Sequence, residues 1–374
     1  MMTQWIWQQA DWPDFHWQQE SLLPLLRQLQ RKAGVLIGRS EVHHEEKQTL
    51  DALLANILAS SAIEDERLNA HSVRSSLARR LGVDEDTPFP VSERSEGVAS
   101  IILDAIDNRH LPLSLARLHQ WHHWLFPHDP WAIHAVNAGV LRGGEPMQVV
   151  SGRIDKPVVH FEAPPREGLE QRLEGFIEWF NQSLHDPLID PILRAAIAHL
   201  WFVTLHPYDD GNGRLTRALT DLALAQADNQ SIRLYAMSVS ILERRSQYYL
   251  ILEQTQKGTL DITRWLLWFL ETLDATLDNA LTRVDSTLAK SRFWRRNDAV
   301  RQLLSIEQLK VINRLLDGGE SGFSEGISAG QYQKVAKVSK ATATRHLAFL
   351  LEHGLLEKLP GGGRNTRYQI AEQE

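Results

Sequence analysis

Apolar side chains recur every three to four residues along most of the chain, and this spacing predicts amphipathic helices. Clear helical stretches lie at residues 18–31, 45–58, 73–81, 168–184 and 191–204. Residues 84–90 contain two prolines and several acidic side chains, which indicates a linker. From about residue 92 to residue 288 the pattern is almost wholly helical. We therefore expect a mainly α protein.

One segment of this helical region has a different pattern. Residues 148–151 and 158–161 are short β-prone runs, separated by turn-forming residues that include Gly152 and Pro157. Such runs are typical of a β-hairpin. We expect a single hairpin here, inserted between helices.

The last part of the chain follows another order of elements. Periodic residues 303–316 precede a Gly/Ser-rich loop, and two further helices are predicted at residues 331–337 and 340–353. The chain ends in two short β-prone runs around three consecutive glycines. Helix, helix, turn, helix and a terminal hairpin resemble a winged helix-turn-helix. The predicted domains are residues 1–90, 91–290 and 300–374.

Composition narrows the class of protein. The 374 residues suffice for two or three domains, and 43% hydrophobic and 23% charged residues are ordinary for a globular protein. No apolar run is long enough to cross a bilayer and no secretory signal is visible, so we expect no membrane contact. The absence of cysteine excludes disulfides and thiolate metal sites and fits a cytoplasmic protein. A net charge of −7 argues against a nucleic-acid coat over the whole chain, but leaves a local basic patch open.

The richest chemistry lies in residues 206–217, which read HPYDDGNGRLTR. The run Gly211-Asn212-Gly213 can expose successive backbone N–H groups as an anion-binding nest. A helix is predicted directly after it, so the helix dipole also favours phosphate there. Arg214 and Arg217 are three residues apart on one helical face and can bind neighbouring phosphates. The segment predicts a site for a nucleotide polyphosphate and its metal.

Two further side chains of this segment suit catalysis. His206 is the best candidate for a general base, because an imidazole titrates near neutrality. Asp210 offers hard oxygen ligands for Mg²⁺ beside the phosphates. Taken singly, a buried histidine and a helix N-cap are the commoner interpretations. Neither interpretation explains both residues beside a glycine nest with two arginines behind it.

The segment resembles the signature of the Fic family, HxFx(D/E)GNGRxxR, with Tyr208 where Phe is usual. The resemblance implies a Fic helical bundle that transfers AMP from Mg-ATP to a Ser, Thr or Tyr hydroxyl of a protein target, or of the chain itself. It assigns His206 as the base and Asp210 as the Mg²⁺ ligand. The remaining implied nucleotide-binding residues are Gly211, Asn212 and Gly213 for the α- and β-phosphates, Arg214 for the β-phosphate and Arg217 for the γ-phosphate.

The resemblance also gives the hairpin a role as a flap that captures the target segment as an added strand. The residues expected to dock the target are Gln148, Val149 and Val150. Ser151 and Gly152, at the turn, would touch the nucleotide. A hairpin that serves stability alone is the alternative. Tyr248 lies in a run that resembles the helix lining the adenine pocket, although a tyrosine there is more often core.

Residues 60–64, SSAIE, resemble the inhibitory motif (S/T)xxxE(G/N) of relatives, with Ser60 first. We expect Glu64 to enter the nucleotide site, pair with Arg217 and misplace ATP. Asp65 replaces the usual Gly or Asn and tolerates a left-handed helix end less readily than Gly. The restraint is therefore expected to be weaker or differently shaped. A chance match, with Glu64 an ordinary surface glutamate, is the alternative.

Other residues suggest competing functions. His119, His122 and His123 lie on one helical side, but no metalloprotease motif accompanies them, so we expect packing or surface roles. The tail carries basic residues that could contact DNA phosphates, namely Lys334, Lys337, Lys340, Arg345, Arg364 and Arg367. Winged helices also dock proteins. The alternative functions are a DNA-binding regulator with a nucleotide-sensing core, or removal of AMP by the same site, and a homodimer is left open.

Overall fold

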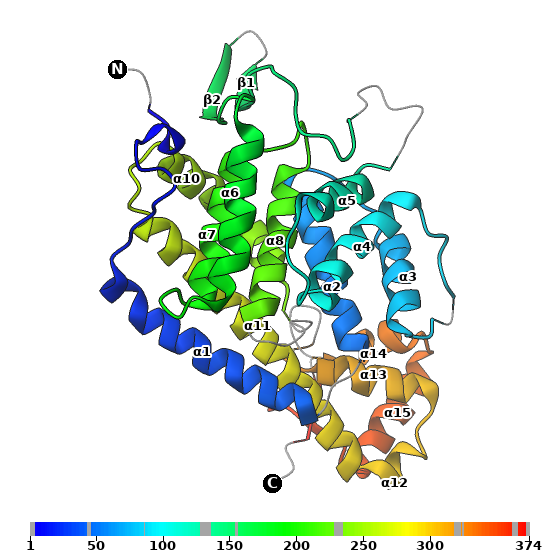
Figure 1. Ribbon diagram of the computed structural model, residues 1–374. Helices are drawn as coiled ribbons and strands as arrows, with labels where there is room; N and C mark the ends of the chain where they lie inside the picture. Colours follow the sequence, from blue (N-terminus) through cyan, green and yellow to red (C-terminus); the bar gives the residue numbers. More distant parts are fainter. Residues whose placement is uncertain are drawn as a thin grey trace. The chain divides into compact units, whose positions relative to one another are not determined.

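The computed structural model describes residues 4–42, 46–85, 87–127, 136–153, 156–227, 235–317, 323, 325–360 and 366–371. The chain divides into two compact units, residues 1–280 and 281–374. Both are mainly helical, and the prediction of a mainly α fold with one hairpin in its first part is confirmed (Figure 1). No helix among the described residues combines the length and apolar character that crossing a lipid bilayer requires.

The first unit begins with a 3₁₀ turn and five helices: η1 (Ile6–Gln8), α1 (Gln19–Val42), α2 (Glu46–Ile63), α3 (Ala70–Leu81), α4 (Glu93–Asp107) and α5 (Leu115–Leu125). The hairpin strands follow, β1 (Gln148–Arg153) and β2 (Lys156–Glu162). The remaining elements are α6 (Leu169–Gln182), η2 (Ser183–His185), α7 (Pro191–Leu205), α8 (Asn212–Ala227), α9 (Met237–Glu243), α10 (Arg245–Gln256) and α11 (Thr263–Arg296), which continues into the second unit.

Helix α7 is the centre of the first unit. Every residue from Leu193 to Leu205 is buried, because the helix is apolar nearly all round and is covered by other elements. Asp190 caps its N-terminus by accepting a hydrogen bond from Ile192 N at 2.8 Å. Helix α8 packs against α7, and the two run side by side in Figure 1. The connection between them is the predicted phosphate loop.

The first ninety residues belong to the same compact unit as the helices that follow. The expected linker does not separate them, because side chains bond across it: Ser72 Oγ accepts from Ser92 N at 3.0 Å, and Ser76 Oγ donates to Glu96 at 2.6 Å. Near the N-terminus, the Trp5 ring packs edge-on against Phe161 of the hairpin, with 5.5 Å between centroids. The tryptophan-rich segment therefore supports the base of the hairpin.

The hairpin has the position that the pattern predicted. Strands β1 and β2 pair antiparallel from Gln148↔Glu162 to Arg153↔Lys156, with a register shift between Val149 and Val150. Ile154 of the predicted turn lies outside the described residues. Since β1 and β2 form a two-stranded sheet, each keeps one open edge.

The second unit contains the end of α11 and a set of short elements: α12 (Asp298–Arg301), α13 (Ile306–Asp317), β3 (Ile327–Ser328), α14 (Ala329–Ala336), α15 (Lys340–Glu352), β4 (Leu356–Lys358) and β5 (Arg367–Ile370). The three strands form an antiparallel sheet in the order β3-β5-β4. Its core includes Val311, Ile327, Tyr332 and Leu347. The three glycines and Arg364 lie outside the described residues.

Candidate active site

The predicted phosphate loop joins α7 to α8 in a tight turn. Helix α7 ends at His206 in the left-handed conformation, with φ 49°, and Gly211 has φ 79° just before α8 begins. A Cβ atom on Gly211 would lie 2.6 Å from Leu125 Cδ2 and 2.7 Å from Phe126 Cε2. Only glycine fits at this point, both for its backbone and for its contact with the end of α5.

Asn212 closes the loop from within. Its Oδ1 accepts from Tyr208 N at 3.0 Å, and its Nδ2 donates to Tyr208 O at 2.8 Å. The side chain is buried, and both of its polar atoms are engaged with the loop by these two bonds. Contact of Asn212 with the phosphates stays a prediction, and the group that could provide it is the main-chain N–H at the start of α8.

Tyr208 is fully buried, and histidines of α5 supply the polar partner that its hydroxyl needs. His119 Nδ1 lies 3.0 Å from the hydroxyl, and the His122 ring stacks on Tyr208 with 4.1 Å between centroids. Gly139 N donates to His122 Nδ1, so His122 Nε2 carries the proton and donates to Asp210 O at 3.1 Å. Burial lowers the pKa of His122 to about 4, which keeps it neutral. These histidines support the loop, and no group of three side chains able to hold a metal occurs among the described residues.

His206 has the tautomer that a base needs. Its Nδ1 lies 3.2 Å from the carbonyl oxygen of Val203 and must donate to it, which leaves the lone pair on Nε2. Burial and, less strongly, the charge of Arg142 lower the pKa of His206 to about 4, against the opposing effects of the hydrogen bond to Val203 and the charges of Glu64 and Asp210. The imidazole is therefore neutral at pH 7 and able to accept a proton.

Arg142 belongs to the site, although no sequence pattern indicated it. Its Nε donates to His206 O at 2.8 Å, and its Nη2 donates to Pro164 O, just after the hairpin. Arg142 N also donates to Pro207 O at 3.0 Å. The side chain is only 1% exposed. One guanidinium thus ties the backbone of the candidate base to the end of the flap.

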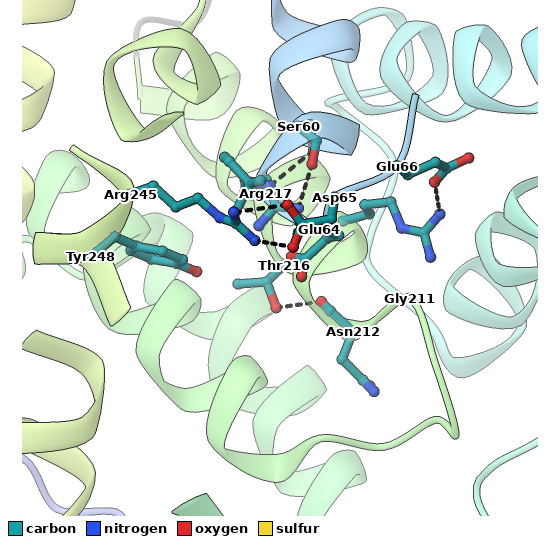
Figure 2. A network of polar contacts seen from close by, with 12 residues as sticks. Ser60, Glu64, Asp65, Glu66, Gly211, Asn212, Thr216, Arg217, Arg245 and Tyr248 are labelled. Atoms are coloured by element: carbon teal, nitrogen blue, oxygen red, sulfur yellow. Dashed lines mark hydrogen bonds and ion pairs between the residues drawn. The ribbon is translucent and has the colours of Figure 1, made fainter. Parts of the chain in front are cut away.

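The predicted pairing of Glu64 with Arg217 is present (Figure 2). Glu64 Oε1 lies 2.9 Å from Arg217 Nη2, while Arg217 Nε donates to Ser60 Oγ at 2.9 Å and Nη2 to Ser60 O at 2.8 Å. Burial alone would raise the pKa of Glu64, but the charge and hydrogen bond of Arg217, the charge of Arg214 and the hydrogen bond of Tyr249 together hold that pKa below its ordinary value. The carboxylate of Glu64 and the hydroxyl and carbonyl oxygens of Ser60 together bind Arg217, the arginine expected to contact the γ-phosphate.

The carboxylate of Glu64 also covers the glycine nest. A Cβ atom on Gly213 would lie 2.0 Å from Glu64 Oε1 and 3.2 Å from Arg217 Nη1. Glu64 therefore rests directly on the first turn of α8, where backbone N–H groups favour an anion. In this structure the carboxylate occupies the position in which a phosphate is expected.

The two residues after Glu64, Asp65 and Glu66, also form ion pairs with arginines. Glu66 pairs with Arg214 through one oxygen and with Arg94 through the other. Asp65 adopts the left-handed conformation, with φ 58°, and accepts from both terminal nitrogens of Arg245 at 2.8 and 2.6 Å. Three consecutive acids thus bind four arginines, and the pairs of Glu66 and Asp65 were not predicted. The bidentate pair with Arg245 gives Asp65 a partner in this conformation, and the weaker or differently shaped restraint expected from Asp65 stays a prediction.

On α10, Tyr248 and Tyr249 have different environments. Tyr248 is 1% exposed, and its hydroxyl lies 3.0 Å from Nε2 of the buried His199. Its contact with a nucleotide stays a prediction. Tyr249 is 37% exposed, and its hydroxyl donates to Ile63 O at 3.0 Å and lies 3.3 Å from Glu64 Oε2. Tyr249 therefore also holds the Glu64 segment in place.

A chain of polar contacts fixes the flap to α10. Ser151 Oγ lies 2.6 Å from His160 Nε2, and His160 Nδ1 lies 2.8 Å from Glu253 Oε2. Lys257 pairs with the other oxygen of Glu253. Ser151 is thus engaged with the flap itself, while Val150 of β1 is 52% exposed. Contact of Ser151 and Gly152 with a nucleotide, and docking of a target on residues 148–150, stay predictions.

Asp210 lies beside the nest with its side chain 60% exposed. One of its oxygens accepts from Gly211 N and lies 3.4 Å from Arg214 Nη2. An exposed carboxylate next to an anion-binding turn has the chemistry of a Mg²⁺ ligand, so the residue fits the predicted role.

Comparisons with known proteins agree with this geometry. Residues 112–224 match the model of the Fic/DOC family, and residues 5–83 match a domain of unknown function, DUF4172. The protein adenylyltransferase Fic of Drosophila virilis is 27% identical over 234 residues, which cover 61% of this chain and 42% of that protein. The protein adenylyltransferase fic-1 of Caenorhabditis elegans is 33% identical over 124 residues, 32% of this chain and 23% of that protein.

The chain therefore spans less than half the length of these relatives. A crystal structure of a Fic family protein from Desulfovibrio desulfuricans G20 has a similar fold, with a TM-score of 0.52 and 19% identity. The similarity covers 94% of this chain and 97% of that one.

Proposed function

Because this chain carries a domain of the Fic/DOC family, we propose that it is a protein adenylyltransferase that moves AMP from Mg-ATP to a protein hydroxyl. The observation that carries the proposal is the neutral His206, with the lone pair on Nε2, beside a glycine nest and two buried arginines. That arrangement supplies a base and an anion site together. The protein whose hydroxyl reaches His206 is the one modified, and it is either a separate target or the chain itself.

The transfer uses few groups. The hydroxyl oxygen attacks the α-phosphorus while its proton passes to His206 Nε2, and the bond from the α-phosphorus to the bridging oxygen breaks, releasing pyrophosphate. The nest and Arg214 would hold the phosphates, and Arg217 the γ-phosphate. A Mg²⁺ ion held by Asp210 would neutralise charge on the leaving pyrophosphate. Positioning and charge account for most of such catalysis.

The proposal is tested by incubating the chain and a cell lysate with ATP labelled at either the α- or the γ-phosphate. We expect protein labelling from α-labelled ATP alone, because AMP is the group transferred. Labelling from the γ-position would indicate a kinase instead. Loss of label from a previously modified protein, without incorporation, would indicate that the same site removes AMP.

The transfer rate is expected to be insensitive to pH between about 8 and 5.5, since the base must be neutral and burial lowers the pKa of His206 to about 4. Protonation, and with it loss of activity, should begin only as the pH approaches that value. The measurement is kcat/KM against pH, with circular dichroism to verify that the protein stays folded. A loss of activity with a midpoint near the ordinary histidine value would show that His206 is not held as described.

We also propose that a target segment adds to the open edge of β1, and that the contacts of His160 position this flap. His160→Ala should raise KM for the protein target about threefold to tenfold, because hydrogen bonds to Ser151 and Glu253 of about 1 kcal/mol each are lost. The KM for ATP should change little. Val158→Ala, at an exposed position of the same strand, is the matched control. Equal changes in both KM values would contradict a role confined to target docking.

A further inference from the structure

The second unit has a helix pair that the proposed transfer does not use. Helix α14 ends at Lys337, whose φ of 55° turns the chain sharply, and Ser339 caps α15 by accepting from Thr342 N at 3.2 Å. The buried side chains of Tyr332 and Leu347 lie in the hydrophobic core of the unit and fix the two helices. A short turn between two packed helices, followed by an antiparallel sheet, is the order of a winged helix-turn-helix.

Helix α15 has one buried side and one open side. Ala343, Leu347 and Leu350 are buried in the core. The exposed residues are Lys340, Ala341, Thr344, Arg345, Ala348 and, at the C-terminal end of the helix, Glu352. Their spacing places them on one stripe of the helix. Small side chains alternate with cations on this stripe, so the helix backbone can come close to a large partner.

The cations around this stripe are unpaired. No acidic side chain of the described residues forms an ion pair with Lys334, Lys337, Lys340 or Arg345, and residues 331–351 contain no acid at all. Residues 281–374 carry fifteen Lys and Arg against ten Asp and Glu, a net charge of +5, in a chain whose total is −7. The positive charge is therefore concentrated in the unit that presents the open helix.

We propose that the second unit is a winged helix-turn-helix that binds double-stranded DNA, with the exposed stripe of α15 in the major groove. The groove is about 12 Å wide and admits one α-helix, and the small residues of the stripe allow that approach. Lys334 and Lys337, at the end of α14, contact the phosphates beside it. Unpaired cations are favoured there, because each phosphate contact releases condensed counterions. This function is separate from nucleotide transfer.

The test measures fluorescence polarisation of a labelled mixed-sequence DNA duplex titrated with the full chain. We expect a dissociation constant on the order of 10⁻⁶ M at low salt, with log K falling against log salt at a slope of about −3 to −4 for four phosphate contacts. The double variant Lys340→Glu/Arg345→Glu should weaken binding at least tenfold. The control, Arg27→Glu/Lys47→Glu, makes the same charge change at exposed positions of the first unit and should leave binding nearly unchanged.

Thermal melting of each variant separates loss of binding from loss of folding, and Lys340→Gln/Arg345→Gln provides a milder substitution of the same stripe. No binding by the parent chain at low salt would overturn the proposal and would favour a protein partner for this face. Equal weakening by both double variants would overturn it as well, because net charge alone would then explain the affinity.

Discussion

Replacing His206 with alanine is expected to lower the rate of AMP transfer by about 10²- to 10⁴-fold, which is the contribution of a positioned general base. The structure leaves this residue one catalytic atom, Nε2, because Nδ1 donates to Val203 O. The proposed phosphate contacts come from Gly211 to Arg217 and do not include the imidazole. Affinity for ATP should therefore change no more than a few-fold.

The comparison is best made in a Glu64→Gly background, so that the rate of the parent is high enough for a large decrease to be measured. Incorporation of label from α-labelled ATP gives the rate, and equilibrium binding of ATP gives the affinity. His185→Ala, at an exposed histidine in the same unit, is the control. If the His206 variant labels proteins as fast as its background, the base is another group and the proposed reaction fails.

The residues that the sequence could predict are those that lie together in it. His206, Asp210 and the two arginines fall within twelve residues, and their functional pattern follows from spacing along one turn and one helix. Ser60 and Glu64 were found in the same way, as a short motif. Local spacing determines such geometry, so the nest could be predicted without knowledge of the tertiary structure, whereas the left-handed conformation of His206 was not predicted.

The residues that the sequence could not predict are joined across long separations. Arg142 bonds to His206 from 64 residues away, and Arg245 bonds to Asp65 from 180 residues away. Nothing in the local pattern of either arginine distinguishes it from a solvated side chain. Asp65 shows the consequence: its backbone preference could be judged from the sequence, whereas its pair with a distant guanidinium could not. The boundary between the units was predicted between residues 290 and 300, beyond the observed division after residue 280, because that division falls within the continuous helix α11.

Replacing Glu64 with glycine is expected to raise the rate of AMP transfer on the order of 10- to 100-fold. The carboxylate lies over the first turn of α8 and pairs with Arg217, which is 2% exposed, so ATP must displace it before its phosphates can be seated. If displacing the Glu64 carboxylate costs about 1.4 to 2.8 kcal/mol, removing that carboxylate increases the fraction of chains competent to bind ATP about 10- to 100-fold. The measurement is labelling of the chain and of lysate proteins, with Glu46→Gly, an exposed glutamate of the same helix, as control.

The arginine pairs of Glu64 and Glu66 are expected to make separate contributions to the proposed restraint, which measurements of nucleotide affinity can distinguish. Glu64 holds the arginine expected to meet the γ-phosphate, so Glu64→Gly should tighten binding of ATP more than that of ADP. Glu66 holds Arg214, so Glu66→Gln should tighten both, by a smaller factor because Arg94 shares that carboxylate. The double variant tests whether the two act together, since adjacent residues of one segment are expected to be coupled. Unchanged labelling by Glu64→Gly would show that its pair with Arg217 does not limit transfer, however well formed that pair is.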